Sequence, residues 1–92
     1  MPLIFEWDEN KAQSNLTKHG ISFEEAATVF ADEDSLTIHD PAHSHSETRF
    51  ITLGSSHTKQ ILVVVHTDRN NWIRIISARP ASKKERLQYK QL

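Results

Sequence analysis

The segment QILVVVHT, residues 60–67, contains the longest apolar run of this 92-residue chain. A strand with one solvated face alternates apolar and polar residues, whereas a continuous apolar run is typical of a strand covered on both faces. The segment therefore predicts the central strand of a β-sheet. A chain of this length has room for one modest core, so we expect a single domain over residues 1–92.

Further strands are predicted on both sides of this segment, over residues 36–39, 48–53 and 72–78. The connections at 54–56 and 68–71 are short and contain Gly, Ser, Asn and Asp, the residues typical of turns. Strands joined by short turns run antiparallel, so we expect an antiparallel sheet. A first strand at 3–7 adds to it.

Helix signals follow the first strand. Asp8 is placed to cap a helix over residues 9–19, which ends at Gly20 because glycine tolerates the left-handed backbone of a C-terminal cap. Ser22 and Glu25 form an S-x-x-E capping box that opens a second helix. We expect its apolar face to form the core with the central strand, burying Phe23, Ala26, Ala27, Phe30, Val63 and Val65, together with Ile75 or Ile76.

A second S-x-x-E box, from Ser82 to Glu85, opens a final helix that reaches about Lys90. The predicted order of elements is β-α-α-β-β-β-β-α. This order predicts an α+β fold, in which an antiparallel sheet carries two N-terminal helices and one C-terminal helix.

The charges divide between the two halves of the chain. Residues 1–48 contain two basic and ten acidic residues, a net charge of −8, whereas residues 49–92 contain nine basic and two acidic residues, a net charge of +7. A basic half predicts a surface for a polyanion such as a nucleic acid. The alternative is that the two halves pair with each other in the fold.

Several classes of protein are excluded. The chain has no cysteine, which rules out disulfides, thiolate catalysis and cysteine-based zinc sites. No apolar run is long enough to cross a membrane, and the first residues, MPLIFE, lack the features of a signal peptide. We expect a cytoplasmic protein without a cofactor. His39, His43 and His45 have a spacing that can bind zinc, but they lie in a polar segment typical of a loop, and we predict no metal site.

Five segments together resemble the BrnT toxin family: FEWD at 5–8, KHGISFEEA at 18–26, LVVVHT at 62–67, IRIISAR at 73–79 and ER at 85–86. They occur in order from about Phe5 to Tyr89. The resemblance implies a compact, metal-independent endoribonuclease, similar in fold to RelE toxins, that cleaves RNA and inhibits translation and growth. It also implies a cognate BrnA-like antitoxin, and operator DNA bound only through the antitoxin complex.

Metal-independent cleavage of RNA requires cations that stabilise the pentacoordinate phosphate. Arginine suits this role because its planar fork binds phosphate oxygens bidentately and stays charged. The candidate catalytic arginines, all in or just after predicted strands, are Arg49, Arg74 and Arg79. The candidates for RNA binding are Lys18, Arg69, Arg86 and Tyr89. The alternative is that some of the cations pair with the acidic half.

The reaction also requires a base and an acid, for which His19 and His66 are candidates. His19 lies at a predicted helix C-terminus, which favours its charged form, but there it also serves as a local cap. His66 is either a base beside the phosphate or a buried histidine bonded to a backbone carbonyl. Tyr89 shares a helix face with Arg86, where it either contacts RNA or packs the helix onto the sheet.

Two other functions stay open from the residues alone. One is a non-catalytic module that binds nucleic acid, and the other is a protein-interaction module that docks through its basic half. Cleavage of naked RNA in EDTA separates an enzyme from a module that only binds.

Overall fold

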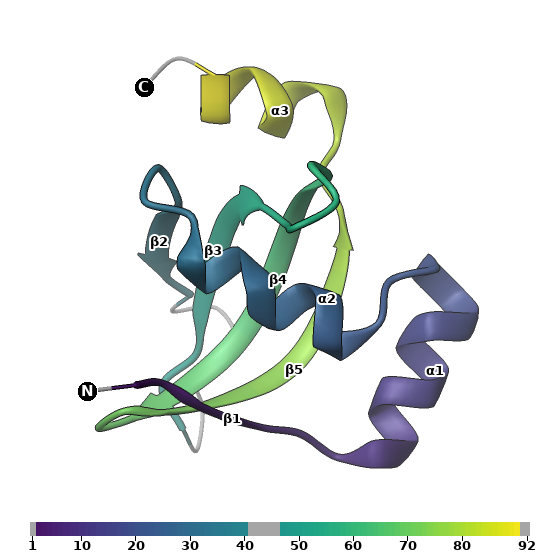
Figure 1. The fold of residues 1–92 in the computed structure, drawn as a ribbon, viewed down its shortest axis with the longest axis vertical. Coiled ribbons are helices and arrows are strands. Elements are labelled where there is room, and N and C mark those ends of the chain that lie inside the picture. Colours follow the sequence, from purple (N-terminus) through teal and green to yellow (C-terminus); the bar gives the residue numbers. More distant parts are fainter. Residues whose placement is uncertain (1, 41–46, 91–92) are drawn as a thin grey trace.

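A five-stranded mixed sheet is the frame of the molecule (Figure 1). The computed structural model describes residues 2–40 and 47–90. The strands are β1 (Ile4–Glu6), β2 (Leu36–His39), β3 (Phe50–Ser55), β4 (Ile61–Arg69) and β5 (Trp72–Pro80). Their order in the sheet is β1-β5-β4-β3-β2, so β4 is the central strand, as its apolar run predicts.

The prediction of a wholly antiparallel sheet is wrong for β1. This strand runs parallel to β5, with Ile4 opposite Trp72 and Glu6 opposite Arg74, whereas β2–β3, β3–β4 and β4–β5 are antiparallel. Short turns force the antiparallel pairs. Most of the chain separates β1 from β5, and so long a connection lets β1 join the sheet edge in either direction.

The helices confirm the α+β class and its two N-terminal helices and one C-terminal helix. They are α1 (Glu9–His19), α2 (Phe23–Thr28) and α3 (Lys83–Lys90), with a 3₁₀ helix, η1 (Val29–Ala31), added after α2. The Asp8 carboxylate caps α1 by accepting from the Lys11 amide, and Gly20 ends it with a φ of 73°. Among the described residues, no helix is long and apolar enough to cross a bilayer.

The main core lies between the sheet and α2, which crosses one of its faces, while α1 lies beside the edge at β5 and contributes Ala12 to this core (Figure 1). Of the predicted core residues, Phe23, Ala26, Val63 and Ile75 are buried. Those that are only partly covered are Ala27, Phe30, Val65 and Ile76. On the other face, α3 covers only one end of the sheet, where Tyr89 packs against Leu53, Val63 and Ala81.

A β-bulge interrupts the pairing of β4 with β5. The register runs to the pair Val65–Ser77 and resumes at His66–Ile75, so Ile76 is an extra residue in β5. An inserted residue exchanges the faces to which the following side chains point. The bulge therefore resets which side chains of β5 face the helices.

The turn predicted at residues 54–56 lies further along the chain. Gly54 is a strand residue of β3, and the turn is closed by hydrogen bonds between Ser56 and Gln60 and between Ser56 and Lys59. A Cβ at Gly54 would lie 2.8 Å from a methyl carbon of Val29. Glycine at this position marks the close approach of η1 to the sheet rather than a turn.

Asn15 joins α1 to the outer edge of β5. Its side chain donates to the carbonyls of Ile21 and Ala78 at 2.9 and 2.8 Å, and its oxygen accepts from the Ala78 amide at 3.1 Å. β1 pairs only with Trp72–Arg74, so Ala78 lies beyond the end of β1. The side chain of Asn15 supplies there the partners that a neighbouring strand supplies elsewhere.

We predict that Asn15→Ala destabilises the fold. Asn15 is 7% exposed, and its removal leaves the buried backbone groups of Ile21 and Ala78 without these partners. The free energy of unfolding, measured by urea denaturation, should fall by about 1–3 kcal/mol. Asn10→Ala, an exposed site on the same helix, is the control and should change little. Equal stability of the two variants would contradict this role.

Candidate functional site

Arg74 and Arg79 point to the same side of the sheet because of the β-bulge. They are five residues apart, an odd spacing that places side chains on opposite faces of a regular strand. The extra residue Ile76 lies between them and restores the phase. Both arginines therefore lie on the face opposite α2, which we call the open face.

The open face also carries Arg49 and Arg69. Arg69 is in β4, opposite Trp72 of β5, and Thr67 is opposite Arg74. Arg49 directly precedes β3 and lines a hollow of about 270 Å³ together with Arg79. The structure thus brings the predicted cations Arg49, Arg69, Arg74 and Arg79 onto one surface.

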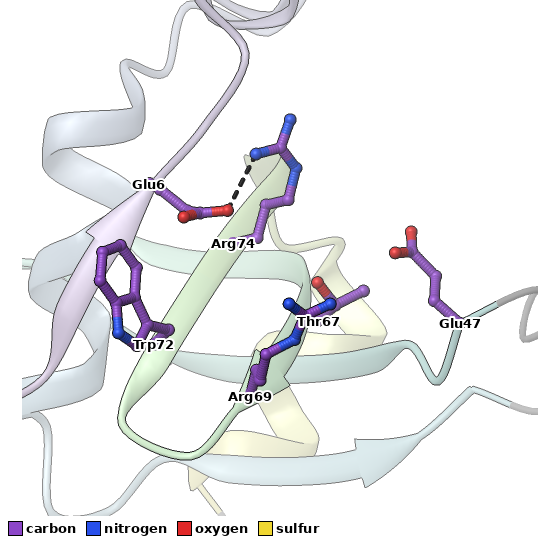
Figure 2. Close-up of a pocket in the computed structure, with 6 residues that line it drawn as sticks. All are labelled: Glu6, Glu47, Thr67, Arg69, Trp72 and Arg74. Carbon is purple, nitrogen blue, oxygen red and sulfur yellow. Dashed lines mark hydrogen bonds and ion pairs between the residues drawn. The ribbon is translucent and has the colours of Figure 1, made fainter.

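One hollow on this face, the tryptophan hollow, has a volume of about 350 Å³ (Figure 2). It is lined by Glu6, Glu47, Thr67, Arg69, Trp72 and Arg74. An Arg74 Nη1–H donates to Glu6 at 2.9 Å, as the dashed line in Figure 2 shows. The side chains of both remain accessible, at 46% and 41% exposure.

The second hollow, the arginine hollow, contains Arg49 and Arg79. Two nitrogens of Arg79 donate to the two oxygens of Glu85, at 2.8 and 2.9 Å. Arg79, with hydrogen bonds from Ser82, lowers the pKa of Glu85 to about 2, and Glu85 in turn raises the pKa of Arg79. The Nε atom of Arg49 lies 3.9 Å from a carboxylate oxygen of Glu47. In both hollows, arginines are thus paired with carboxylates.

A third hollow lies where α1 meets β5. It is lined by Lys18 and His19 from α1 and by Ile76 and Ser77 from β5. Ile76 and Ser77 also line the arginine hollow. The predicted residues Lys18 and His19 therefore adjoin the same segment of β5 as Arg49 and Arg79.

His66 is not part of the open face. It is 1% exposed and lies between the rings of Phe30 and Phe50, at centroid distances of 4.8 and 5.9 Å. Its Nδ1–H donates to Asp68 at 2.6 Å, and Nε2 accepts from the Thr52 hydroxyl at 2.7 Å. Burial lowers the pKa of His66, although Asp68 opposes this shift. Its partners are side chains rather than the backbone carbonyl considered from the sequence.

The other predicted residues, Tyr89 and Arg86, hold α3 in place. Tyr89 donates its hydroxyl to Asp32 at 2.6 Å, and this bond raises the pKa of Tyr89 to about 12. Arg86 is exposed and donates to the Ala81 carbonyl at 2.9 Å. For Tyr89, the contacts match the packing alternative, because the ring lies against Leu53 and Val63.

A family model described as "Ribonuclease toxin, BrnT, of type II toxin-antitoxin system" matches residues 7–85. The chain belongs to the BrnT toxin family. The crystal structure of the Brucella abortus ribonuclease toxin BrnT is similar to this one, with a TM-score of 0.61 and 26% sequence identity over 90% of this chain and 99% of that chain. A comparison with curated protein sequences finds no match. Membership of the family implies an RNA substrate and a partner antitoxin.

Sequence reasoning missed two side chains of this BrnT toxin, Glu6 and Trp72. Trp72 and Arg74 are two residues apart in a predicted strand, so their common face was available from the alternation alone. The contact of Glu6 with Arg74 could not be predicted from the sequence, because it depends on the parallel pairing of β1 with β5.

Of the three histidines whose spacing can bind zinc, the structure describes one. His39 is exposed and contacts the ring of Phe50, whereas His43 and His45 lie outside the described residues. Within residues 2–40 and 47–90, no group of three or more metal-ligating side chains is placed to hold an ion.

We predict that His66 of this BrnT toxin titrates below the value of about 6.5 usual for an unfolded histidine. The unfolded chain then binds a proton that the folded protein resists, so the free energy of unfolding falls as the pH drops below about 6.5. The titration of the His66 ring in NMR spectra measures this. Asp68→Asn should lower the midpoint further, because Asp68 raises the pKa. A midpoint above 6.5 would contradict the prediction.

Proposed function

We propose that this toxin is a metal-independent endoribonuclease that binds single-stranded RNA across the open face, cleaves it there and thereby inhibits translation and growth. The observation that supports this proposal is the placement of four arginines on the open face of the sheet, of which α3 covers only one end, in a member of a family of ribonuclease toxins. We also propose a cytoplasmic location. The likeness to RelE toxins stays a prediction.

Arg49, Arg74 and Arg79 are the proposed phosphate-stabilising residues. They project from or beside strands, which hold their positions rigidly, and charge on the phosphate oxygens grows in the transition state. The carboxylate partners Glu6 and Glu85 orient two of the guanidinium groups. A guanidinium has five N–H donors. Arg79 uses three hydrogen bonds, two to Glu85 and one to the Pro80 carbonyl, and so keeps donors for a phosphate.

Lys18 and Arg69 are the proposed supporting cations, and His19 is the proposed proton-transfer residue. The observation that favours His19 over His66 is its position in the hollow that shares Ile76 and Ser77 with the arginine hollow. His66 lies on the buried face of the same sheet. We assign His66, Arg86 and Tyr89 to the support of the open face rather than to contact with RNA.

We predict that single substitutions of the phosphate-stabilising arginines lower cleavage without loss of the fold. Arg49→Ala, Arg74→Ala and Arg79→Ala should each reduce the single-turnover rate on naked RNA in EDTA by on the order of 10²–10³, as expected for the loss of one transition-state donor. The rate should also fall steeply with rising salt, because bound phosphates release counterions.

The control for these variants is Lys84→Ala, an exposed cation on α3, and the melting temperature is measured for each protein. Wild-type rates in all three arginine variants would refute the site. RNA binding by the wild-type toxin without any cleavage would instead identify a non-catalytic module.

We further propose that the partner is a BrnA-like antitoxin that covers the open face, and that operator DNA is bound only by the complex. Co-expression with the antitoxin should yield a stable complex and restore growth, because an acidic or extended segment of the partner would occupy the cationic surface. Size-exclusion chromatography and growth curves test this. Failure to form a complex and to restore growth would exclude this partner.

A further inference from the structure

We propose that the tryptophan hollow is a base-binding subsite that selects guanine in RNA. This inference rests on the proposed ribonuclease function, which it deepens by naming the base beside the cleaved bond. Glu6 and Trp72 are the residues that carry it. Neither is proposed to contact the phosphate, although Glu6 also orients Arg74 through a hydrogen bond.

The two hollows differ in their lining. Two arginines, two glutamates and the ring of Trp72 line the tryptophan hollow. Two arginines and one aspartate line the arginine hollow, where Glu85 also pairs with Arg79. A nucleobase is neutral and offers donors as well as acceptors, so the hollow that combines a ring with carboxylates and arginines suits a base, beside the phosphate that Arg49, Arg74 and Arg79 are proposed to bind.

Trp72 supplies a stacking surface for that base. Its side chain is 45% exposed although it is the largest apolar residue on the open face. It stands opposite Arg69 at the end of the β4–β5 hairpin, where it lines the hollow beside Glu6 (Figure 2). Unstacked bases of single-stranded RNA commonly lie on such exposed aromatic rings.

The Glu6 carboxylate determines which base fits. A carboxylate has two acceptor oxygens. Guanine presents two adjacent donors, N1–H and the N2 amino group, on its Watson–Crick edge, and the acceptors O6 and N7 that arginine binds bidentately. Adenine and cytosine place a lone pair beside their single amino group, and uracil offers one N–H. Guanine alone therefore matches a carboxylate and an arginine at once.

The Glu6 carboxylate is held in position before a base binds. β1 lies parallel to β5 with Glu6 opposite Arg74, and the 2.9 Å hydrogen bond from Arg74 fixes one carboxylate oxygen. Backbone pairing on a strand and a charge-assisted hydrogen bond both limit rotation of the side chain. A positioned acceptor loses less entropy when a base binds, which increases selectivity.

The subsite also lies at a useful distance from the arginine hollow. Val65 lines the arginine hollow and Thr67 the tryptophan hollow, two residues apart on the same face of β4. Two residues span about 7 Å along a strand. A nucleotide whose base occupies the tryptophan hollow therefore presents its phosphate toward Arg49 and Arg79, so we expect the cut beside a guanosine.

The test uses RNA oligonucleotides that are identical apart from one nucleotide in a run of uridines, which is guanosine, inosine, adenosine or cytidine. The wild-type toxin should cleave beside guanosine at least about 10-fold faster than beside adenosine or cytidine. Inosine, which lacks the N2 amino group, should fall between them. Equal rates beside all four nucleotides would overturn the guanine assignment.

Substitutions distinguish the role of Trp72 in stacking from the role of Glu6 in base selection. Trp72→Ala should raise KM for the guanosine substrate about 10-fold, whereas Trp72→Phe keeps a stacking ring and most of the affinity. Glu6→Gln should remove the preference for guanosine over inosine and adenosine, because an amide offers one acceptor and a donor. Glu9→Gln, an exposed glutamate of α1, is the charge-matched control. An unchanged preference in Glu6→Gln would overturn the role of Glu6.

Binding without cleavage is measured by quenching of tryptophan fluorescence with guanosine or adenosine 3′-monophosphate, with Trp72→Phe as the reference for the remaining Trp7 signal. Stronger quenching by the guanosine nucleotide supports the subsite even if no RNA is cleaved, in which case the ribonuclease proposal fails alone. Cleavage of RNA with equal quenching by both nucleotides overturns the subsite and leaves the ribonuclease proposal standing.

Discussion

Burial of Leu62, Val64 and His66 against the helices sets the orientation of every other side chain on β4. A strand alternates its faces, so once these three point inward, Thr67 and Arg69 must point outward. β5 pairs with β4, and the bulge at Ile76 of β5 lies between Arg74 and Arg79. Because of this bulge, both arginines point outward. The cationic surface is thus a consequence of how the core packs.

The carboxylates on the open face reconcile the two interpretations of the charge asymmetry. Glu6 and Glu47 from the acidic half pair with Arg74 and Arg49, so part of the asymmetry is cancelled in the fold. Exposed ion pairs of this kind contribute little stability, because solvent screens them and ordering two long side chains costs entropy. They orient the guanidinium groups, and a phosphate with a higher charge density can compete for the same donors.

The features predicted correctly from the sequence are local ones. The cap of Asp8, the left-handed Gly20 and the central position of β4 depend on residues close to one another in the chain. The parallel pairing of β1 depends on contacts about 70 residues away, and no local pattern reveals it. Glu25 combines a local contact that could be predicted with distant contacts that could not. The Ser22 hydroxyl accepts from the Glu25 amide, as the capping box predicts. The Glu25 carboxylate instead accepts from Ser56, Thr58 and Gln60 in a distant turn.

His66 shows why residue type alone does not locate a site. Asp68, His66 and Thr52 form a hydrogen-bonded chain like that of an acid–base relay, with distances of 2.6 and 2.7 Å. The chain continues from Thr52 to the hydroxyl of the exposed residue Thr37 at 2.8 Å, but the ring of His66 is 1% exposed, so no substrate contacts the imidazole itself. The chain satisfies the polar atoms of an imidazole that packs between two aromatic rings, which is the usual requirement for burying one. The proposed proton transfer on the open face requires groups that solvent reaches, and the face to which each residue points is the reason for proposing His19 rather than His66.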